Sequence, residues 1–239
     1  LNRSVLQRAV DSNNPEALKL ILSLYPECEH LQIVSRQNQR GKTLLHEIAG
    51  SKRWGSKPSD SSGPIECFKL ILSLYPESER LQAVRTQSQD GETVLHSAAQ
   101  FRDFETFKFI LTLFPDSHHM QQVMSMQNRD GYTVLHHAVR SNNIEWINTI
   151  LSLYPSESER YQALNVQTVS GETVLHCAAR ACDLNCIIAI LSWYPESRRL
   201  QAMNVQDRRG QTVLNRMNRN ARDSVMAFLS SKSESPCAE

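Results

Sequence analysis

Hydrophobic residues recur in regular blocks along this chain, and five of the blocks share one spacing. In each, a glycine is followed two residues later by threonine, then by an aliphatic pair and a histidine. These boxes are Gly41–His46, Gly91–His96, Gly131–His136, Gly171–His176 and Gly210–Asn215, the last with asparagine in place of histidine. Beyond the longer first interval, successive glycines lie 39 or 40 residues apart. A fixed period of this size predicts a repeat protein, in which each repeat buries its apolar face against its neighbours.

Each repeat contains three predicted helices. The first follows the box, with threonine as its N-cap and with the aliphatic and alanine positions toward the next repeat. The second is the most apolar segment and ends at a proline, as in Leu20–Pro26, because proline lacks an amide proton and disfavours helical geometry in the residue before it. The third is a short link such as Glu77–Val84, with acids at its start and apolar residues three apart.

A glutamine stands four residues before each glycine. Its identity in every copy predicts that the side chain satisfies backbone groups of the loop leading into the box, which we prefer to a ligand contact. The five residues are Gln37, Gln87, Gln127, Gln167 and Gln206.

The run DGETVLHSAAQFRDFETFKFILTLFP, Asp90–Pro115, resembles the ankyrin repeat, whose consensus places DxxGxTPLHxAAxxG before a second helix that ends in a leucine pair. The resemblance covers almost the whole chain, with a degenerate helix pair at Ser4–Pro26. It implies an all-α, ankyrin-like repeat solenoid of about six helix pairs, with the first and last pairs as caps. It also implies that the chain binds another protein through its concave face.

The chain departs from the ankyrin pattern in three ways. Valine or leucine replaces the proline of the box. The longer period predicts short extra helical links in place of the β-hairpin fingers of the family. The last helix carries Arg216, Asn218, Arg219 and Asn220 where alanines are usual, which suits a polar cap. The long links also resemble those of ankyrin effector proteins that intracellular bacteria deliver into host cells.

We expect one array over residues 1–230, followed by a disordered tail at 231–239. Its repeats span about 1–40, 41–90, 91–130, 131–170 and 171–209, with a cap at 210–230. The second repeat carries an insertion at 51–64, rich in glycine, serine and proline, in which Trp54 sits beside two cations. A tolerated loop is the preferred interpretation of this insertion, and a contact through Trp54 is the alternative.

Composition and charge add little to this picture. Hydrophobic residues make up 40% and charged residues 21%, and the formal net charge is +1. No apolar run approaches the roughly 20 residues that cross a bilayer, and the N-terminal stretch does not fit a signal peptide, so we expect a cytoplasmic protein with no membrane partner. The effector resemblance implies secretion into the cytoplasm or nucleus of a host cell. A further alternative is that the chain is a spacer or substrate-recruiting region of a larger enzyme.

The box histidines do not predict a metal site. Equivalent positions of stacked repeats lie about 10 Å apart, so no two of these imidazoles can share one ion. Each is expected to bond to backbone in its own turn instead. The residues are His46, His96, His136 and His176.

Three cysteines near His176 are the densest cluster of soft ligands. The spacing of Cys177, Cys182 and Cys186 fits no common zinc pattern, so we favour their role as small core residues with reduced thiols. The sequence also lacks the usual phosphate-binding, hydrolase, metalloprotease and dinucleotide motifs. We therefore predict no catalytic residue, no metal, no cofactor and no enzyme activity.

Candidate contact residues come from the ankyrin pattern, in which the residues after the box histidine and after the alanine pair face the groove. These are Arg8, Asp11, Glu47, Ser97, Gln100, Phe101, His137, Arg140, Ser141, Cys177, Arg180, Arg216 and Arg219. The predicted partner-binding set is Phe101, Gln100, His137, Arg140, Cys177, Arg180, Arg216, Arg219 and Trp54. Within it, Phe101, Arg140 and Arg180 are expected to form one strip, because they occupy matching or adjacent positions.

Seven arginines against one acid lie between Arg198 and Arg222. This cluster predicts attraction to an acidic protein surface, although a solvated basic face is the commoner meaning. Nucleic acid is a weaker alternative, because the net charge of the chain is close to zero.

Overall fold

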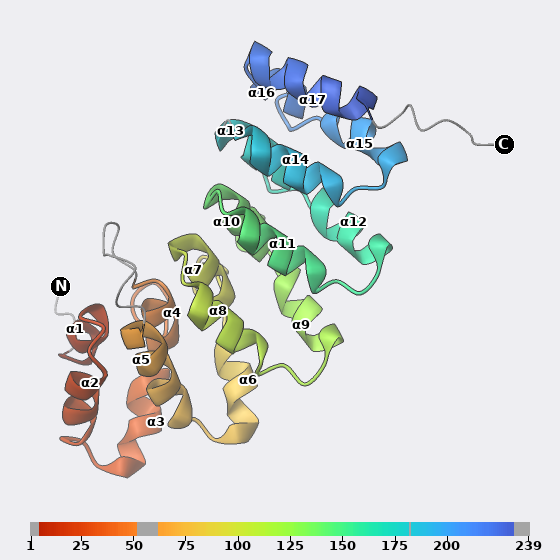
Figure 1. Cartoon of the computed structure of the whole chain (residues 1–239). Coiled ribbons are helices and arrows are strands. Elements are labelled where there is room, and N and C mark those ends of the chain that lie inside the picture. The colour runs from red at the N-terminus through yellow and green to blue at the C-terminus, as the bar shows by residue number, and fades with distance from the viewer. Residues whose placement is uncertain (1–4, 52–61, 182, 232–239) are drawn as a thin grey trace. The chain divides into compact units, whose positions relative to one another are not determined.

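The structure is a computed structural model that describes residues 5–51, 62–181 and 183–231. Helices dominate these ranges and confirm the predicted all-α, ankyrin-like repeat fold (Figure 1). Contacts divide the chain into two compact units, Leu1–Arg129 and Asp130–Glu239, here called the N-unit and the C-unit. The single array over 1–230 stays a prediction. Trp54, most of the insertion and the tail from residue 232 lie outside the described residues.

The described residues contain six helix pairs. In the first five the second helix packs on the first, whereas the two helices of the sixth pack on those of the fifth. In the N-unit the pairs are α1 (Val5–Asp11) with α2 (Pro15–Leu22), α4 (Leu44–Ala49) with α5 (Ser62–Ser73), and α7 (Val94–Phe101) with α8 (Phe104–Leu111). In the C-unit they are α10 (Val134–Arg140) with α11 (Ile144–Ser152), α13 (Val174–Ala181) with α14 (Leu184–Ser192), and α16 (Val213–Arg216) with α17 (Arg219–Ser231).

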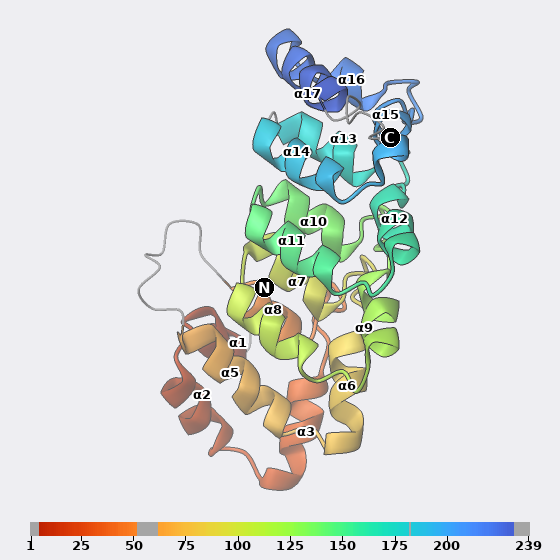
Figure 2. The same ribbon diagram turned by 45° about the vertical axis from the view of Figure 1, so that its right-hand side comes forward.

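Link helices connect the pairs, as the sequence predicts. They stand on one side of the pairs within each unit (Figure 2). In the N-unit they are α3 (Glu27–Ser35), α6 (Glu77–Arg85) and α9 (Ser117–Met124); in the C-unit they are α12 (Glu157–Asn165) and α15 (Glu196–Met203). Second helices pack on second helices, α2 on α5 and α5 on α8 in the N-unit, and α11 on α14 and α14 on α17 in the C-unit.

The second helices end a turn earlier than their prolines. Helix α2 ends at Leu22, and α8 ends at Leu111. Pro26 is instead the N-cap of the link helix α3, with a ψ of 141°. The residue before a proline is disfavoured in helical geometry, so the chain leaves the helix before the proline. Pro76 and Pro195 also cap their link helices, whereas Asp116 and Ser156 cap the other two.

The box caps the N-terminus of the first helix that follows it. The Thr43 N–H donates to His46 Nδ1 at 3.2 Å in a capping box. Because Nδ1 accepts, Nε2 carries the ring proton, and it donates to the Glu92 carbonyl at 3.1 Å. His176 does the same with the Gln211 carbonyl at 3.2 Å. The expected bond within the turn is confirmed, and the bond to the next repeat was not foreseen.

A tight turn that we call the finger lies between each link helix and the next box. It runs from three residues before the glycine to one residue after it; four of the fingers are residues 38–42, 88–92, 168–172 and 207–211. The Ser88 N–H donates to the Glu92 carbonyl at 2.8 Å, and the Ser88 side chain accepts from the Glu92 N–H. The finger therefore persists beside the link helix, and in the described residues its only strand-like pairing is the isolated bridge between Gln206 and Thr212.

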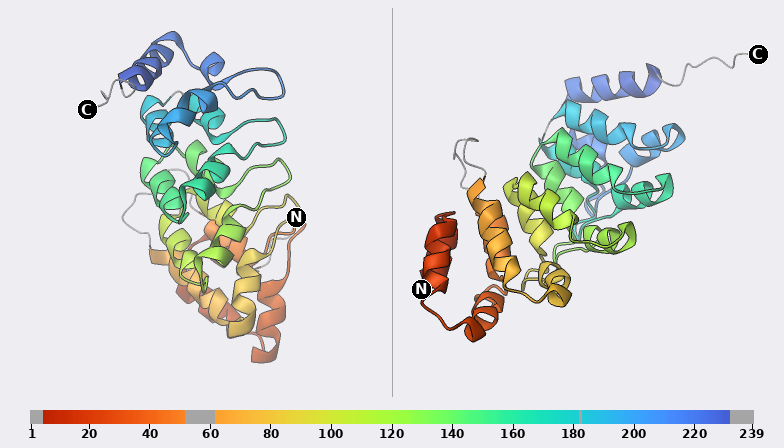
Figure 3. Two further views of the ribbon diagram at one scale, coloured as in Figure 1. Left: turned by 90° about the vertical axis from the view of Figure 1, so that its right-hand side faces the viewer. Right: turned by 60° about the horizontal axis from the view of Figure 1, so that its bottom comes forward.

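Neighbouring fingers are joined by one repeated backbone hydrogen bond. Within each unit the fingers project from one side (Figure 3). The Gln89 N–H donates to the Arg40 carbonyl at 2.9 Å in the N-unit, and the Arg208 N–H donates to the Ser170 carbonyl at 3.0 Å in the C-unit. The recurring glutamine supports this turn: Gln87 and Gln167 donate to the Gly91 and Gly171 carbonyls. Its predicted structural role is confirmed at these two positions.

The two end repeats differ in polarity. The outer residues of α17 are mostly polar, with Arg219, Asn220 and Arg222 exposed, as expected of a cap. The prediction that the first pair is also a cap is wrong, because Leu20 and Leu24 are exposed large apolar residues. They align with Leu70 and Leu74 of the next repeat, and no described element covers them.

Finger stacking predicts unequal effects for two glycines of positive φ. Gly131 has φ +81°, and an added Cβ would lie 2.6 Å from the Val169 backbone nitrogen, whereas Gly210 has φ +72° and nothing within 4 Å. Gly210→Ala should lower the free energy of unfolding by about 1–2 kcal/mol through backbone strain alone. Gly131→Ala should lower the free energy of unfolding by a further amount of about 1–3 kcal/mol, because the added Cβ displaces the neighbouring finger. Urea denaturation measures both, and equal losses would contradict the proposed stacking constraint.

The buried imidazole predicts a pH dependence of stability. Burial lowers the pKa of His46 from 6.5 to about 4, with nearby Lys42 contributing, while the bond to the Glu92 carbonyl opposes the shift. Between pH 6.5 and pH 4 His46 binds a proton in the unfolded chain but remains neutral in the folded chain. The contribution of neutral His46 to the free energy of unfolding is therefore complete above pH 6.5. About 3 kcal/mol of this free energy should be lost as the pH falls to about 4.

The matched variant is His46→Gln, because Gln7 stands at this position in the first repeat. Urea midpoints of the parent and the variant should converge as the pH falls from 6.5 to 4. Parallel profiles for the two proteins would show that His46 is not the group responsible.

Candidate functional site

A groove in the C-unit brings together four of the arginines noted in the sequence, Arg180, Arg208, Arg209 and Arg216. It has a volume of about 840 Å³ and lies between fingers and first helices. Tyr132, Glu172 and Gln211 each follow a finger glycine, while Arg180 comes from α13 and Arg216 from α16. We call this surface the arginine groove; its lining is Tyr132, Ser170, Glu172, Arg180, Asp207, Arg208, Arg209, Gln211 and Arg216.

Two acids hold two of these arginines in place. Arg216 Nη1 donates to Glu172 Oε1 at 2.7 Å and also pairs with Asp207, while Arg180 pairs with the same Glu172 oxygen. Burial alone would raise the pKa of Glu172, but hydrogen bonds from Arg216 and Arg180 outweigh it and hold that pKa below its usual value. Arg216, which the sequence placed among free contact residues, is thus largely a structural cation.

Asp207 is shared between the finger and the groove. Its Oδ1 accepts the backbone N–H groups of Arg209 and Gln211, each at 2.8 Å. Burial would raise the pKa of Asp207, yet the Gln211 N–H and Arg216 lower it. The acid is therefore ionised at neutral pH, and its charge is directed toward Arg216 rather than toward solvent.

Tyr132 places an aromatic ring among the cations. The Arg140 guanidinium carbon lies 5.3 Å from the ring centroid, a cation–π distance. The His137 ring lies 5.6 Å from the same centroid and is buried. The structure thus brings the predicted residues Arg140 and Arg180 to one surface, linked by a tyrosine that the sequence analysis did not select.

Four predicted groove residues are buried, so the expectation that they face a partner is wrong. They are Ser97, His137, Ser141 and Cys177. His137 lies against Tyr132, and Cys177 lies near enough to Glu172 for that carboxylate to raise its pKa after burial. The residue after the box histidine is covered wherever the finger residue or a long neighbouring side chain closes over it.

The other predicted contacts are placed unevenly. Gln100 is exposed and Phe101 half-buried in the N-unit, where the Phe101 ring would meet a Cβ at Gly50 at 3.3 Å. Arg219 is exposed at the start of α17 in the C-unit. Phe101 belongs to a different compact unit from Arg140 and Arg180. The single strip of these three residues therefore stays a prediction.

Arg208 and Arg209 are exposed at the last finger and form no ion pair with any described residue. Both belong to the basic cluster noted in the sequence, but neither was among the predicted contacts. Their position just before Gly210 was the available signal, because a fingertip side chain packs against no helix of its own repeat.

Buried thiols and imidazoles of the described residues offer little chemistry. Burial raises the pKa of Cys67, Cys177 and Cys186 to about 11, which leaves the thiols protonated. Cys177 and Cys186 sit on different helices, α13 and α14. Within the described ranges no three histidine, cysteine or acidic side chains gather as a metal site would require. Cys182 and Cys237 lie outside those ranges.

Comparison with known proteins agrees with this architecture. A family model described as ankyrin repeats, three copies, matches residues 59–160. No curated protein matches the chain significantly. None of the described helices combines the length and apolar character that spanning a bilayer requires. Residues 59–160 are thus similar to ankyrin repeats, and the helix pairs of both units share the ankyrin-like fold.

Proposed function

We propose that this protein is a protein-interaction module whose C-unit binds an acidic segment of a partner in the arginine groove. Ankyrin repeats are in general protein-interaction modules, and the match over residues 59–160 supports that broad role. One observation carries the finer proposal: Arg208 and Arg209 are exposed and unpaired in the part of the chain described, beside a groove whose other cations are already held by Glu172 and Asp207.

The groove suits a carboxylate-bearing peptide better than a small molecule. The groove is open to solvent, and its polar groups come from three successive repeats, so an extended ligand can contact several of them. Two free guanidiniums favour carboxylates in bidentate geometry. Tyr132 offers a rigid aromatic surface for an apolar residue of the same ligand.

Two finer parts of the proposal concern biological setting. The resemblance of the long links to those of bacterial effector proteins supports a partner from a host cell, with action in the host cytoplasm or nucleus. The alternative is a substrate-recruiting region or spacer of a larger enzyme. In both settings the same groove would make the contact, so the test below applies to either.

A pair of synthetic peptides tests the groove. One is rich in aspartate and glutamate, and the other carries asparagine and glutamine at the same positions. The acidic peptide should bind the full chain, and Arg208→Glu with Arg209→Glu should weaken it by at least about tenfold, because two attractive contacts become repulsive. Fluorescence anisotropy measures the dissociation constants, and urea midpoints confirm that the variant remains folded.

Arg40→Glu is the matched control, because Arg40 occupies the same fingertip position in the N-unit as Arg209 in the C-unit. This change should leave binding nearly unaltered. The proposal fails if the control weakens binding as much as the groove variant, or if the amide peptide binds equally well. Tighter, steeply salt-dependent binding of a DNA duplex would point to nucleic acid instead.

A further inference from the structure

The N-unit ends in an apolar face that no described residue covers. Leu20, Leu24 and Tyr25 on and after α2 are 67%, 76% and 38% exposed. At the matching place in the next repeat, Tyr75 is only 6% exposed, and the leucines there are half-buried. Contiguous exposed apolar residues on a folded domain usually mark a surface that another element covers.

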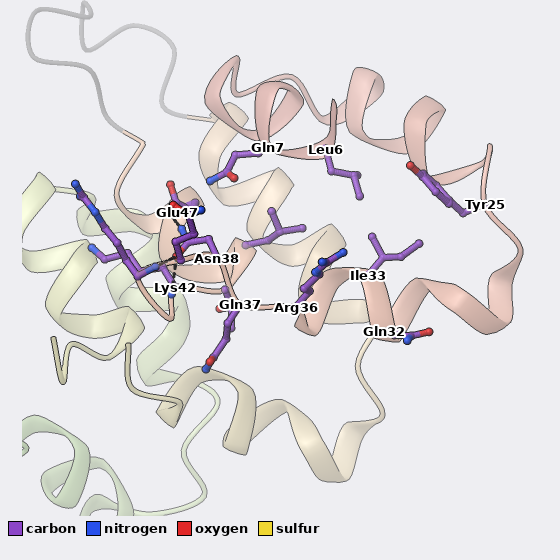
Figure 4. A pocket seen from close by; sticks show the side chains of 14 residues that line it. Leu6, Gln7, Tyr25, Gln32, Ile33, Arg36, Gln37, Asn38, Lys42 and Glu47 are labelled. Carbon is purple, nitrogen blue, oxygen red and sulfur yellow. Dashed lines mark hydrogen bonds between the residues drawn. The ribbon is translucent and has the colours of Figure 1, made fainter. Parts of the chain in front are cut away.

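A cavity of about 1140 Å³ adjoins this face (Figure 4). Leu6 of α1, Ile33 of α3 and Tyr25 line it, together with the finger at 38–42. It is the larger of the two cavities described here, and it is lined by neutral apolar and amide side chains to a greater extent than the arginine groove. We call this cavity the socket.

The next repeat shows what fills the equivalent space. The Tyr75 hydroxyl donates to the Val34 carbonyl at 3.2 Å, and the Gln89 N–H donates to the Arg40 carbonyl at 2.9 Å. The end of α3 and the finger that follows it therefore occupy the socket of their neighbour. The C-unit repeats both bonds, from Tyr194 to the Leu164 carbonyl and from the Arg208 N–H to the Ser170 carbonyl.

The first repeat carries the same donors without acceptors. Tyr25 matches Tyr75, and Gln39 matches Gln89. Neither the Tyr25 hydroxyl nor the Gln39 backbone N–H has an acceptor among the residues described. Both donors and the exposed leucines stand in the register that a stacked neighbour satisfies elsewhere in the N-unit.

We propose that this face is a docking surface for one further repeat of the same kind, stacked in line with the others. The incoming link helix supplies Tyr25 with the carbonyl seven residues before its finger glycine, and the incoming finger supplies Gln39 with the carbonyl just before that glycine. The surface thus continues an interface that the N-unit already contains. It is separate from the arginine groove.

A second copy of this chain fits the face poorly. The opposite end of the chain presents the polar outer residues of α17, including Arg219 and Arg222. Two N-terminal faces placed against each other would bring donors to donors at Tyr25 and Gln39. Only a link helix and finger in the usual direction offer the carbonyls that both groups lack.

The test joins a copy of Thr133–Glu172, one complete repeat, ahead of Ser4 in place of residues 1–3. Amide hydrogen exchange of Gln39 is measured by NMR in the joined and parent chains. Docking should slow this exchange by at least about tenfold, because the N–H gains a carbonyl and is covered. Leu20→Ser with Leu24→Ser should abolish the protection in the joined chain. In the parent the same changes should leave the urea midpoint unaltered, because both side chains are exposed.

Three outcomes would overturn the proposal. The first is fast exchange of Gln39 in the joined chain. The second is an added repeat that gains no helical signal, since the same sequence folds within the C-unit and only the new interface would be lacking. The third is a parent chain that light scattering shows to be a dimer and that Leu20→Ser with Leu24→Ser converts to a monomer, because a second copy would then be the occupant.

Discussion

A repeat of this chain can bury its apolar face only against another repeat, and within each unit that contact is reinforced at fixed points by hydrogen bonds. A box histidine reaches the backbone carbonyl beside the next box in each unit, as His46 reaches Glu92 and His176 reaches Gln211. A tyrosine after the second helix reaches the end of the preceding link helix in each unit, as Tyr75 reaches Val34 and Tyr194 reaches Leu164. Apolar burial supplies most of the stabilisation, whereas these directed bonds fix the register.

The cost of burying polar groups explains why the box varies so little. The His46 imidazole is buried where protonation of Nδ1 would place a proton against the Thr43 N–H, so this ring stays neutral and uses both nitrogens in hydrogen bonds. A side chain committed on both nitrogens is a poor metal ligand or general base. The most frequent chemically versatile residue of the repeat is therefore used for structure.

Function is left to positions that stacking does not constrain. The residue after each finger glycine differs among the copies. Lys42 and Glu92 form a 3.0 Å ion pair in the N-unit, while Tyr132, Glu172 and Gln211 line the arginine groove in the C-unit. Fingertip residues contribute their backbone to stacking, so their side chains are free to vary. Arg208 and Arg209 combine both conditions, because their backbone is held while their side chains reach solvent.

The sequence alone determined what depends on local chemistry: the period, the threonine caps, the helix pairs, the links and the loop role of the recurring glutamine. Only the tertiary structure decided which side chains remain accessible, because that depends on what the neighbouring repeat contributes. Tyr132 covers His137, Glu172 and Asp207 hold Arg216, and the lack of a covering element leaves Leu20 exposed. The first two of these effects involve contacts between residues about 5 to 45 positions apart, and the third depends on a repeat that lies at the end of a stack. A local sequence pattern does not specify either one.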